Sequence, residues 1–303
     1  MRHINRKNPN RIKTPKGDIV FVGIIDILMM FALLIVAIPV LNVISSSFSS
    51  AEMVSAGKVG IFPRDFSVVG YRMILQSQKL VIGYANTVFY TFFGTLCNLI
   101  MTTIIAYPLS RDDFKARNAI MKLFTVTMYI GGGTIPTYLL MRSLGFINHR
   151  IVMILPGAIS VYNMIVMRTY FKTNIPHELL ESTKIDGCSD FRFLVQFAIP
   201  LSKAIIAVMT LFYGIGHWND YFNAYLYLSD EKKYPLSVFF QLILGGIVTK
   251  GMEKDVQLEA AKGQYDEVLR YALIMVSCVP VWCAYPFVQK YFVKGVMIGS
   301  IKG

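Results

Sequence analysis

The sequence predicts an all-helical membrane protein that crosses the bilayer six times. Of its 303 residues, 54% are apolar and 16% are charged, whereas about 25% are charged in soluble domains. The mean hydropathy is positive, at +0.51. Six apolar windows are long enough to cross the hydrocarbon core, which takes about 20 helical residues. These observations exclude a secreted domain and a disordered chain. The net charge of +12 is spread along the chain, which indicates anionic lipid rather than nucleic acid as its partner.

Each predicted span is a run with few charges between polar segments. The first carries one charge, Asp26, the second carries none, and the third has Lys122 near its start. A seventh apolar run, 235–249, has only 15 residues and contains a Gly-Gly pair. That run predicts a re-entrant, interfacial or packed loop segment rather than a span. The six predicted spans are 19–44, 82–108, 119–141, 150–171, 201–228 and 271–291.

Basic residues predict the orientation. The first 18 residues hold six Lys and Arg. The apolar run behind them is longer than the core of a signal peptide, which indicates an uncleaved helix. With the N-terminus inside, the predicted inner segments carry 14 Lys and Arg in 67 residues, and the outer segments carry 11 in 87. This bias has the sign of the positive-inside rule and predicts that both termini are cytoplasmic.

Motifs of enzymes and metal sites are absent from the sequence. The four cysteines form no CxxC pair, and the four histidines form no HExxH motif. The run Gly131-Gly132-Gly133 lacks the lysine of a phosphate-binding loop. It indicates close helix packing or a helix break before Pro136.

The inner segment 172–200 predicts two short helices that meet at a glycine. Asn174 is suited to cap the first helix, with Pro176 in its first turn. Gly187 is suited to the left-handed position that ends it. Ser189 is suited to cap a second helix over 190–198, and Pro200 to begin the next span. The second helix is predicted to bury one face, made of Phe191, Leu194, Val195 and Ala198. A loop of 29 residues with this preformed shape favours a docking site for a cytoplasmic partner over a simple connection.

The run Glu181-Ser-Thr-Lys-Ile-Asp186-Gly187, with Pro200 thirteen residues later, resembles the EAA loop of ABC importer permeases. Ser182 and Thr183 stand where two alanines are usual. Four further segments extend the resemblance, most strongly over 82–303. They are Asn86-Thr87, Gly131–Pro136, Trp218-Asn219-Asp220 and the C-terminal run 294–303. The chain is therefore similar to the second transmembrane subunit of a carbohydrate-class, maltose-type importer with the MetI-like fold, and within that class to the LplC/YtcP-like group.

This resemblance implies a type I permease bundle with a defined organisation. It divides the chain into a basic arm at 1–18, a first helix and outer loop at 19–81, a five-helix core at 82–293 and a cytoplasmic tail at 294–303. It implies a second permease subunit, two nucleotide-binding ATPase subunits that hold Mg-ATP, and an extracytoplasmic sugar-binding protein. The last would dock on the outer surface, where the polar, mixed-charge loop 229–270 suits a transient contact. The implied activity is import of a carbohydrate through a bacterial plasma membrane. The resemblance implies an oligosaccharide, and acidic oligosaccharides are among the candidates. The chain itself would be no enzyme and would hold no cofactor or metal.

The resemblance also implies two sets of functional residues. Those that couple the permease to the ATPase are Glu181, Ser182, Thr183, Asp186, Gly187 and Pro200. We expect Glu181 and Asp186 to fix the elbow or to pair with basic groups of the ATPase. An aromatic, amide-rich run at the end of the fifth span is a candidate lining of the substrate path, because sugar rings stack on aromatic faces and amides bind hydroxyls. An interfacial aromatic belt is an equal explanation of it. The path candidates are Trp218, Asn219, Asp220, Tyr221 and Asn223.

Two other classes of protein compete with the permease interpretation. A stand-alone secondary transporter often has repeated halves and an intramembrane relay of ionisable groups, and neither is found in this sequence. Transport without an ATPase subunit would favour that class. An intramembrane enzyme would need paired metal ligands or a nucleophile and base on facing spans, and no such pairing is found.

Overall fold

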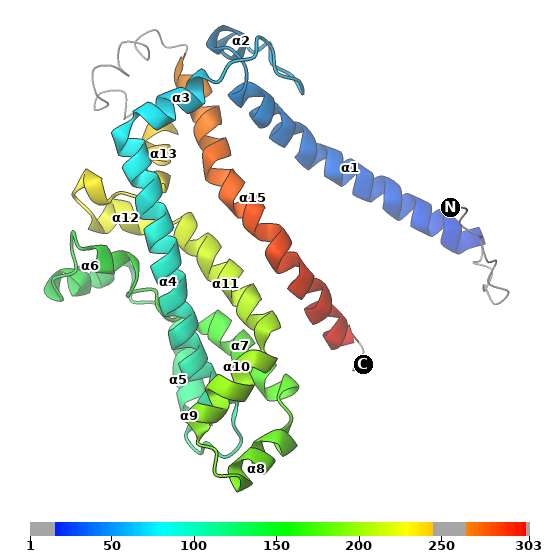
Figure 1. Ribbon diagram of the computed structural model, residues 1–303, viewed down its shortest axis with the longest axis vertical. Coiled ribbons are helices and arrows are strands. Elements are labelled where there is room, and N and C mark those ends of the chain that lie inside the picture. Colours follow the sequence, from blue (N-terminus) through cyan, green and yellow to red (C-terminus); the bar gives the residue numbers. More distant parts are fainter. Residues whose placement is uncertain (1–15, 245–264, 301–303) are drawn as a thin grey trace.

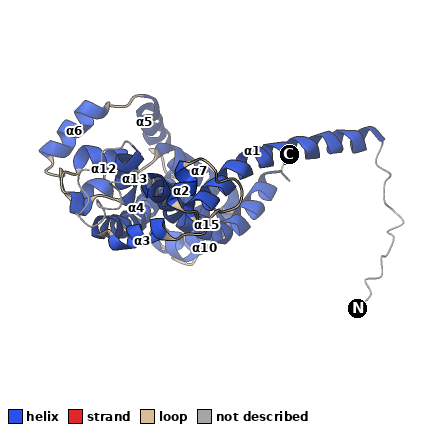
Figure 2. Ribbon diagram, turned by 90° about the horizontal axis from the view of Figure 1, so that it is seen from above, coloured by secondary structure: helices blue, strands red, loops and turns tan. Residues whose placement is uncertain are grey.

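The computed structural model describes residues 16–244 and 265–300, and within these two ranges every regular element is a helix (Figure 1, Figure 2). The helices are α1 (Lys16–Ser47), α2 (Ala51–Ser55), α3 (Val69–Gln76), α4 (Gln78–Ser110), α5 (Arg117–Tyr129), α6 (Thr134–Ser143), α7 (Val161–Asn174), α8 (His177–Ile185), α9 (Asp190–Phe193), α10 (Ile199–Leu201), α11 (Lys203–Trp218), α12 (Phe222–Tyr227), α13 (Leu236–Leu244) and α15 (Tyr265–Ser300). Short turns are η1 (Arg150–Met153), the π turn η2 (Leu194–Ala198) and η3 (Glu231–Lys233). The all-helical prediction is confirmed for this part of the chain.

Helix α4 is the central rod of the bundle. Helices α7 and α11 pack along it, and α15 packs on α11 and on the outer helix α3. Figure 1 shows α4 running the length of the bundle, with α8 and α9 at one end and α3 at the other. Helix α1 contacts α15 and otherwise extends away from the bundle. The core around α4 is apolar and aromatic; its fully buried members include Tyr90, Met164, Met167, Phe171 and Phe193.

Three described helical segments are long and apolar enough to cross a membrane: Val20–Ser47, Gln78–Ser110 and Asp266–Phe287. A fourth candidate is the pair Asp190–Leu201 and Lys203–Trp218, which is bent by 84°. The structure thus supports a membrane protein, whereas the number of six spans stays a prediction.

Three of the predicted spans are broken rather than continuous. The window 119–141 is interrupted between α5 and α6, where Gly133 adopts a positive φ of 80°. Among the described residues no atom lies within 4 Å of a Cβ built on Gly131 or Gly132, so within this part of the chain the run is a helix break rather than a close-packing site. The window 150–171 begins with η1, and its regular helix α7 begins only after Pro156-Gly157.

The fifth window, 201–228, is broken for a different reason. Helix α11 ends at Trp218, and the Asp220 carboxylate accepts the backbone N–H of Asn223 at 3.2 Å. An aspartate that bonds the backbone three residues on starts a new helix rather than continuing the old one. The run 235–249 contains α13 up to Leu244; the remainder of it lies outside the described residues.

Polar side chains of α4 hold the irregular segments in place. The Asn86 amide donates to the carbonyls of Lys232 and Tyr234, at 2.8 and 3.1 Å. Its oxygen accepts from Arg150 at 3.1 Å. Deeper in the bundle, the Asn98 amide donates to the Gly157 carbonyl, and its oxygen pairs with the ring of His217, both at 2.6 Å. Backbone groups that leave a helix inside a membrane need such partners.

Replacing Asn86 by alanine should destabilise the protein by about 1–3 kcal/mol, because two carbonyls and a guanidinium lose their buried partner. The measurement is thermal unfolding of the purified protein in detergent. Asn118, an exposed residue of α5 without a hydrogen bond to the described residues, offers the control, and Asn118→Ala should change stability by less than about 0.5 kcal/mol. Equal effects of the two substitutions would contradict the role given to Asn86.

Candidate functional site

The segment 172–200 forms an elbow at one end of the bundle, as the sequence predicts. Helix α8 ends at Ile185, and Gly187 adopts a positive φ of 74°. The Gly187 N–H donates to the Lys184 carbonyl at 3.0 Å, and the Cys188 N–H donates to the Thr183 carbonyl at 2.9 Å. This pair of bonds is a Schellman motif, in which a left-handed glycine closes the helix. The Ser189 hydroxyl then caps α9 by accepting the Arg192 N–H. The predicted turn and second cap are confirmed.

The start of the first elbow helix differs from the prediction. Asn174 is the last residue of α7 and caps nothing; its amide donates to the Tyr170 carbonyl. Pro176 lies at the cap position of α8 rather than in its first turn. The reason is local, since the residue before a proline is driven out of the helical region, and Ile175 is extended with φ −96° and ψ 115°.

The second elbow helix also differs, because it contains a π turn. The Ile199 N–H donates to the Leu194 carbonyl, five residues back. The wider turn rotates the helix, so Phe193, Leu194 and Ala198 are buried while Phe191 and Val195 are exposed. The predicted apolar face is therefore half wrong. Pro200 lies inside α10, and the next long helix begins at Lys203, after the sharp bend at Ser202.

An ionic cluster fastens the elbow to the end of α4. Arg111 is 8% exposed, and its guanidinium forms two hydrogen bonds to the Asp113 carboxylate, at 3.1 and 2.7 Å. It also contacts the Asp190 carboxylate at 3.2 Å, and Lys184 reaches Asp113 at 2.7 Å. We call these four residues the elbow clamp. Tyr107 completes its base, since the Arg111 guanidinium donates to the Tyr107 hydroxyl at 2.8 Å.

The partners of Asp113 in the clamp favour the ionised form of its carboxyl group. Hydrogen bonds from Arg111 and then from Lys184 hold the pKa of Asp113 well below its usual range. A carboxyl group with a lowered folded pKa stabilises the fold above its ordinary pKa of about 4. That contribution is lost only as the pH falls through the lowered value.

The predicted coupling residues divide into buried and exposed groups. Thr183 is buried, and its hydroxyl donates to the Leu180 carbonyl. Glu181, Ser182, Asp186, Gly187 and Pro200 are exposed. Glu181 contacts only the imidazole of His177, at 3.2 Å, and Asp186 has no side-chain partner among the described residues. The expectation that Glu181 and Asp186 fix the elbow is not met; Lys184 and Asp190 do so. A pairing of the two acids with another protein stays a prediction.

Three segments predicted to lie outside meet at the opposite end of α4. Lys79, just inside α4, pairs with Glu231 at 2.8 Å. The Asn148 oxygen accepts the backbone N–H groups of Ser229 and Asp230, at 3.3 and 3.1 Å. The predicted inner segments 109–118 and 172–200 meet at the elbow clamp instead. These contacts therefore divide the loops into two groups. The groups are the same as the inner and outer segments predicted from the distribution of Lys and Arg.

The candidate path residues lie where α11 gives way to α12. The Trp218 indole N–H donates to the Ser277 carbonyl at 3.0 Å, and its ring meets Tyr84 edge-on at 5.9 Å. Asp220 bonds both the backbone and the amide of Asn223, which is a structural role. Asn219 and Tyr221 are exposed. Of the five candidates, Trp218 and Asn219 line a pocket, and a place for any of the five on a substrate path stays a prediction.

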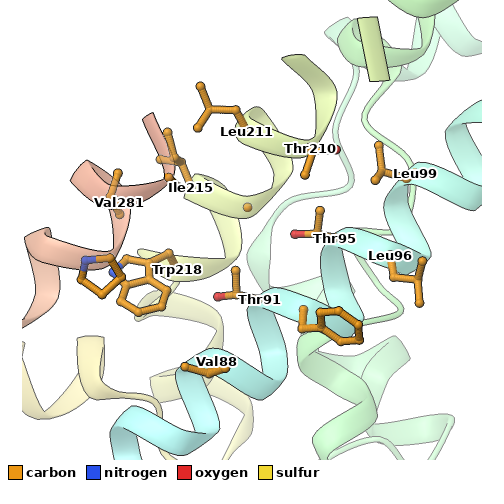
Figure 3. A pocket seen from close by; sticks show the side chains of 14 residues that line it. Val88, Thr91, Thr95, Leu96, Leu99, Thr210, Leu211, Ile215, Trp218 and Val281 are labelled. Carbon is orange, nitrogen blue, oxygen red and sulfur yellow. The ribbon is translucent and has the colours of Figure 1, made fainter. Parts of the chain in front are cut away.

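Two cavities of about 450 Å³ each meet at Trp218. The apolar groove lies between α4, α11 and α15 and includes the hydroxyls of Thr91 and Thr95 (Figure 3). Neither of these buried hydroxyls has a hydrogen-bond partner in the described structure. The outer pocket lies toward α13 and is more polar. Its lining includes Thr87, Trp218, Asn219, Ser237, Ser277 and Trp282.

Sequence reasoning missed the elbow clamp and half of the outer pocket. The Arg-Asp-Asp run at 111–113, directly behind an uncharged span, is a visible signal of a polar anchor. Its partners Lys184 and Asp190 are 71 and 79 positions away, and no local pattern relates them. Ser277 and Trp282 lie inside the apolar window 271–291, and this pattern predicts a span but no pocket.

Known proteins resemble this chain over most of its length. It is 39% identical over 277 residues to the polygalacturonan/rhamnogalacturonan transport system permease protein YtcP of Bacillus subtilis (strain 168), which covers 91% of this chain and 96% of that protein. It is 35% identical over 269 residues to protein LplC of the same organism, at 89% and 90% coverage. A chain in the crystal structure of a bacterial ABC transporter involved in the import of the acidic polysaccharide alginate superposes with a TM-score of 0.85. That chain is 32% identical, and the match covers 93% of this chain and 99% of that one. No protein-family model matches this chain.

The helical bundle, together with these matches, defines a membrane-embedded transport subunit. The chain belongs to the family of sugar ABC importer permeases that includes YtcP and LplC. The family resemblance predicted from the sequence is thereby confirmed.

Replacing Asp113 by asparagine should loosen the elbow. A bidentate bond to a buried guanidinium, discounted for the half-exposed carboxylate, contributes about 1.4 kcal/mol, so amide hydrogen exchange over 177–190 should become roughly tenfold faster. Asp186→Asn removes the same charge from the elbow without breaking a contact, and it should leave exchange unchanged. Indistinguishable exchange in the two variants would refute the clamp.

Replacing Gly187 by alanine should impair transport through backbone strain alone, since no atom lies within 4 Å of a Cβ at this position. A left-handed L-residue costs roughly 1–2 kcal/mol, and asparagine tolerates that conformation better. We therefore expect ATP-driven uptake to fall in the order glycine, asparagine, alanine. Gly131→Ala, at a glycine without positive φ and with equal space, is the control. Full uptake by Gly187→Ala would contradict the turn requirement.

Proposed function

We propose that this chain is one of two transmembrane subunits of an ATP-driven importer, and that it moves a carbohydrate into the cytoplasm by alternating access. The observation that carries the proposal is the exposed surface of the elbow. Ile185 and Phe191 are 86% and 72% exposed, next to the carboxylate of Asp186, which has no partner among the described residues. Exposed large apolar side chains on a rigidly held element indicate a protein interface.

The partner at this interface would be a nucleotide-binding ATPase subunit, one of two in the complex, with Mg-ATP bound there. The sequence contains no phosphate-binding loop of its own. In this assignment Glu181 and Asp186 meet basic groups of the ATPase, and Gly187 keeps the elbow bent. Ser182, Thr183 and Pro200 shape the two helices that carry the contact. The elbow clamp then transmits the movement of the elbow to α4.

The topology that accompanies this function has six crossings and both termini in the cytoplasm of a bacterium, in its plasma membrane. The grouping of loops supports it, because 109–118 meets 172–200 at the clamp while 79, 148 and 229–234 meet at the other end. The third crossing would combine α5 and α6, and the fifth would be α11. Short and broken helices suit a span only where neighbours or a cavity cover them.

The second permease and the sugar-binding protein would occupy the remaining exposed surfaces. None of the most apolar window of α1 is buried within this chain. Helix α1 stands away from the core in Figure 1, so it offers a long apolar surface to lipid and to another subunit. The outer face carries Lys79, Glu231 and Lys232 near the surface, and mixed charges of this kind suit a transient partner.

The substrate class would be an acidic oligosaccharide. YtcP is named for polygalacturonan and rhamnogalacturonan, and the alginate transporter imports an acidic polysaccharide. Polygalacturonan and alginate share a chain of uronate sugars, which carry one carboxylate per ring. We propose the same chemistry for this importer.

Affinity purification of the tagged chain from its native membrane in mild detergent tests the assembly. Mass spectrometry should find a second six-span permease and an ATPase subunit. Glu181→Lys, which reverses the charge on the exposed elbow, should lower ATPase recovery several-fold or uncouple hydrolysis from uptake. Lys115→Glu is a charge reversal outside the elbow, at an exposed residue without an ion pair to the described residues, and should have less effect. Recovery of the chain alone after gentle crosslinking would contradict the importer assignment.

A further inference from the structure

We propose that the loop between α2 and α3 inserts its apolar tip into the headgroup boundary of the lipid bilayer and so anchors the adjoining end of α1. Residues 57–67 form this loop, which we call the fold-back loop. Two observations carry the proposal. The loop turns polar groups inward and apolar side chains outward, and its contacts place it beside the end of the first predicted span. The ligand is lipid rather than sugar, so the inference goes beyond the proposed function.

Polar side chains of α1 hold the first half of the fold-back loop along the end of that helix. The Asn42 amide donates to the carbonyls of Val59 and Gly60, at 3.0 and 3.2 Å. The Ser45 hydroxyl donates to the carbonyl of Ile61. Asn42 and Ser45 are three residues apart and therefore lie on one face of α1. The loop covers this polar face, since Ser45 is only 3% exposed.

The second half of the fold-back loop is tied just past the end of α1. The Arg64 N–H donates to the Ser49 hydroxyl at 3.0 Å, and the Arg64 carbonyl accepts the Ser50 N–H at 3.3 Å. The ring of Phe66 stacks on that of Phe48, with 5.8 Å between the centroids. Because both halves are tied to the same helix end, the fold sets the direction in which the side chains of the loop point.

The side chains that the fold-back loop turns outward are apolar. Ile61 is 47% exposed, Phe62 is 80% exposed and Phe66 is 71% exposed, and Pro63 between them is exposed as well. A loop in water has the opposite arrangement, because the hydrophobic effect buries apolar side chains and leaves polar groups to the solvent. The inverted arrangement indicates apolar surroundings at this tip.

The bilayer is the apolar environment that the position of the loop indicates. The first predicted span ends at residue 44, between Asn42 and Ser45, whose side chains hold the loop. None of the most apolar window of α1 is buried within this chain. Val40 and Leu41, directly before Asn42, are 39% and 40% exposed. The exposed apolar surface of α1 therefore continues into the tip of the fold-back loop.

Charged residues flank the tip on both sides. Lys58 and Arg64 are exposed and form no ion pair with the described residues, and the acid of the loop, Asp65, is exposed too. Apolar side chains at the acyl boundary with cations at the level of the headgroups are typical of segments that lie in a membrane interface. Figure 1 shows the loop beside α1 and apart from α12 and α13, so it is separate from the mixed-charge face proposed for the sugar-binding protein.

Photocrosslinking tests the proposal, with the chain and the subunits that copurify with it in nanodiscs of phosphatidylglycerol and phosphatidylcholine. Phe62→p-benzoyl-phenylalanine puts the reactive group at the tip, and mass spectrometry separates lipid adducts from protein adducts. The same probe at Glu52, exposed on α2, and at Ile185, exposed and apolar on the elbow, provides two controls. We expect lipid adducts at position 62 to exceed those at either control about tenfold, because only the tip enters the interface.

Three results would overturn the bilayer contact. Protein adducts in place of lipid adducts at position 62 would make the tip a contact with another subunit or a binding protein. Absence of both kinds of adduct would mean that the tip faces water. Equal lipid yields at positions 62 and 52 would show that the tip has no preference over its surroundings.

Arg64→Gln tests the headgroup contact, since the backbone of this residue ties the loop while its side chain is exposed. The ratio of phosphatidylglycerol to phosphatidylcholine adducts at position 62 should fall about fivefold, the effect of one cation near an anionic surface. Lys232→Gln removes a charge from η3, away from the loop, and should leave the ratio unchanged. An unchanged ratio in Arg64→Gln would overturn the role given to Arg64.

Discussion

The structure depends on polar side chains placed along a single apolar rod, α4. In a membrane each unpaired backbone group costs several kcal/mol, and this fold leaves helical geometry at 154–160 and, on either side of η3, at 228–230 and 234–235. Asn98 and Asn86 supply the hydrogen bonds that those segments lack. Thr102 adds a third tie by pairing with the Tyr213 hydroxyl of α11 at 2.7 Å. Side chains of α4 thus provide hydrogen bonds that water would provide outside a membrane.

The same rod joins the two functional ends. Helix α4 has 33 residues, or about 50 Å at 1.5 Å per residue. One end of it meets the elbow through Arg111, and its other half lines the outer pocket at Thr87. Arg168 adds a bond to the Leu109 carbonyl at 2.8 Å, where a cation favours the negative end of the helix dipole. In the proposed mechanism, α4 would carry a displacement of the elbow to the pocket, because it is tied to neighbouring segments at both ends.

The limits of prediction from sequence follow from what each signal measures. Apolar length locates α1, α4 and α15, because one helix satisfies all its own backbone groups. It fails for 119–141, 150–171 and 201–228, where Gly133, Pro156 and Asp220 break the helix inside an apolar window. The glycine turn of the elbow was predictable because Gly187 acts locally. The clamp was not, because Arg111 and Asp190 meet only through the tertiary fold. The face of α9 was half wrong for a related reason, since a π turn changes the period on which facial patterns depend.

The elbow shows how one short helix serves two purposes. On α8, Leu180, Thr183 and Lys184 face the bundle or its clamp, whereas Glu181 and Ile185 are exposed. Inward and outward residues alternate at helical spacing, so the helix is fixed on one side and available on the other. Helix α8 is fixed by the ion pair of Lys184 at its exposed end and by the apolar packing of Leu180 at its buried end. These two kinds of contact together hold the helix against the bundle. A clamp made of Glu181 and Asp186 would have used the two acids that we propose for docking. Because Lys184 and Asp190 form the ion pairs of the clamp, Glu181 and Asp186 stay exposed. The elbow is therefore held in place while its two acids remain accessible for the proposed partner.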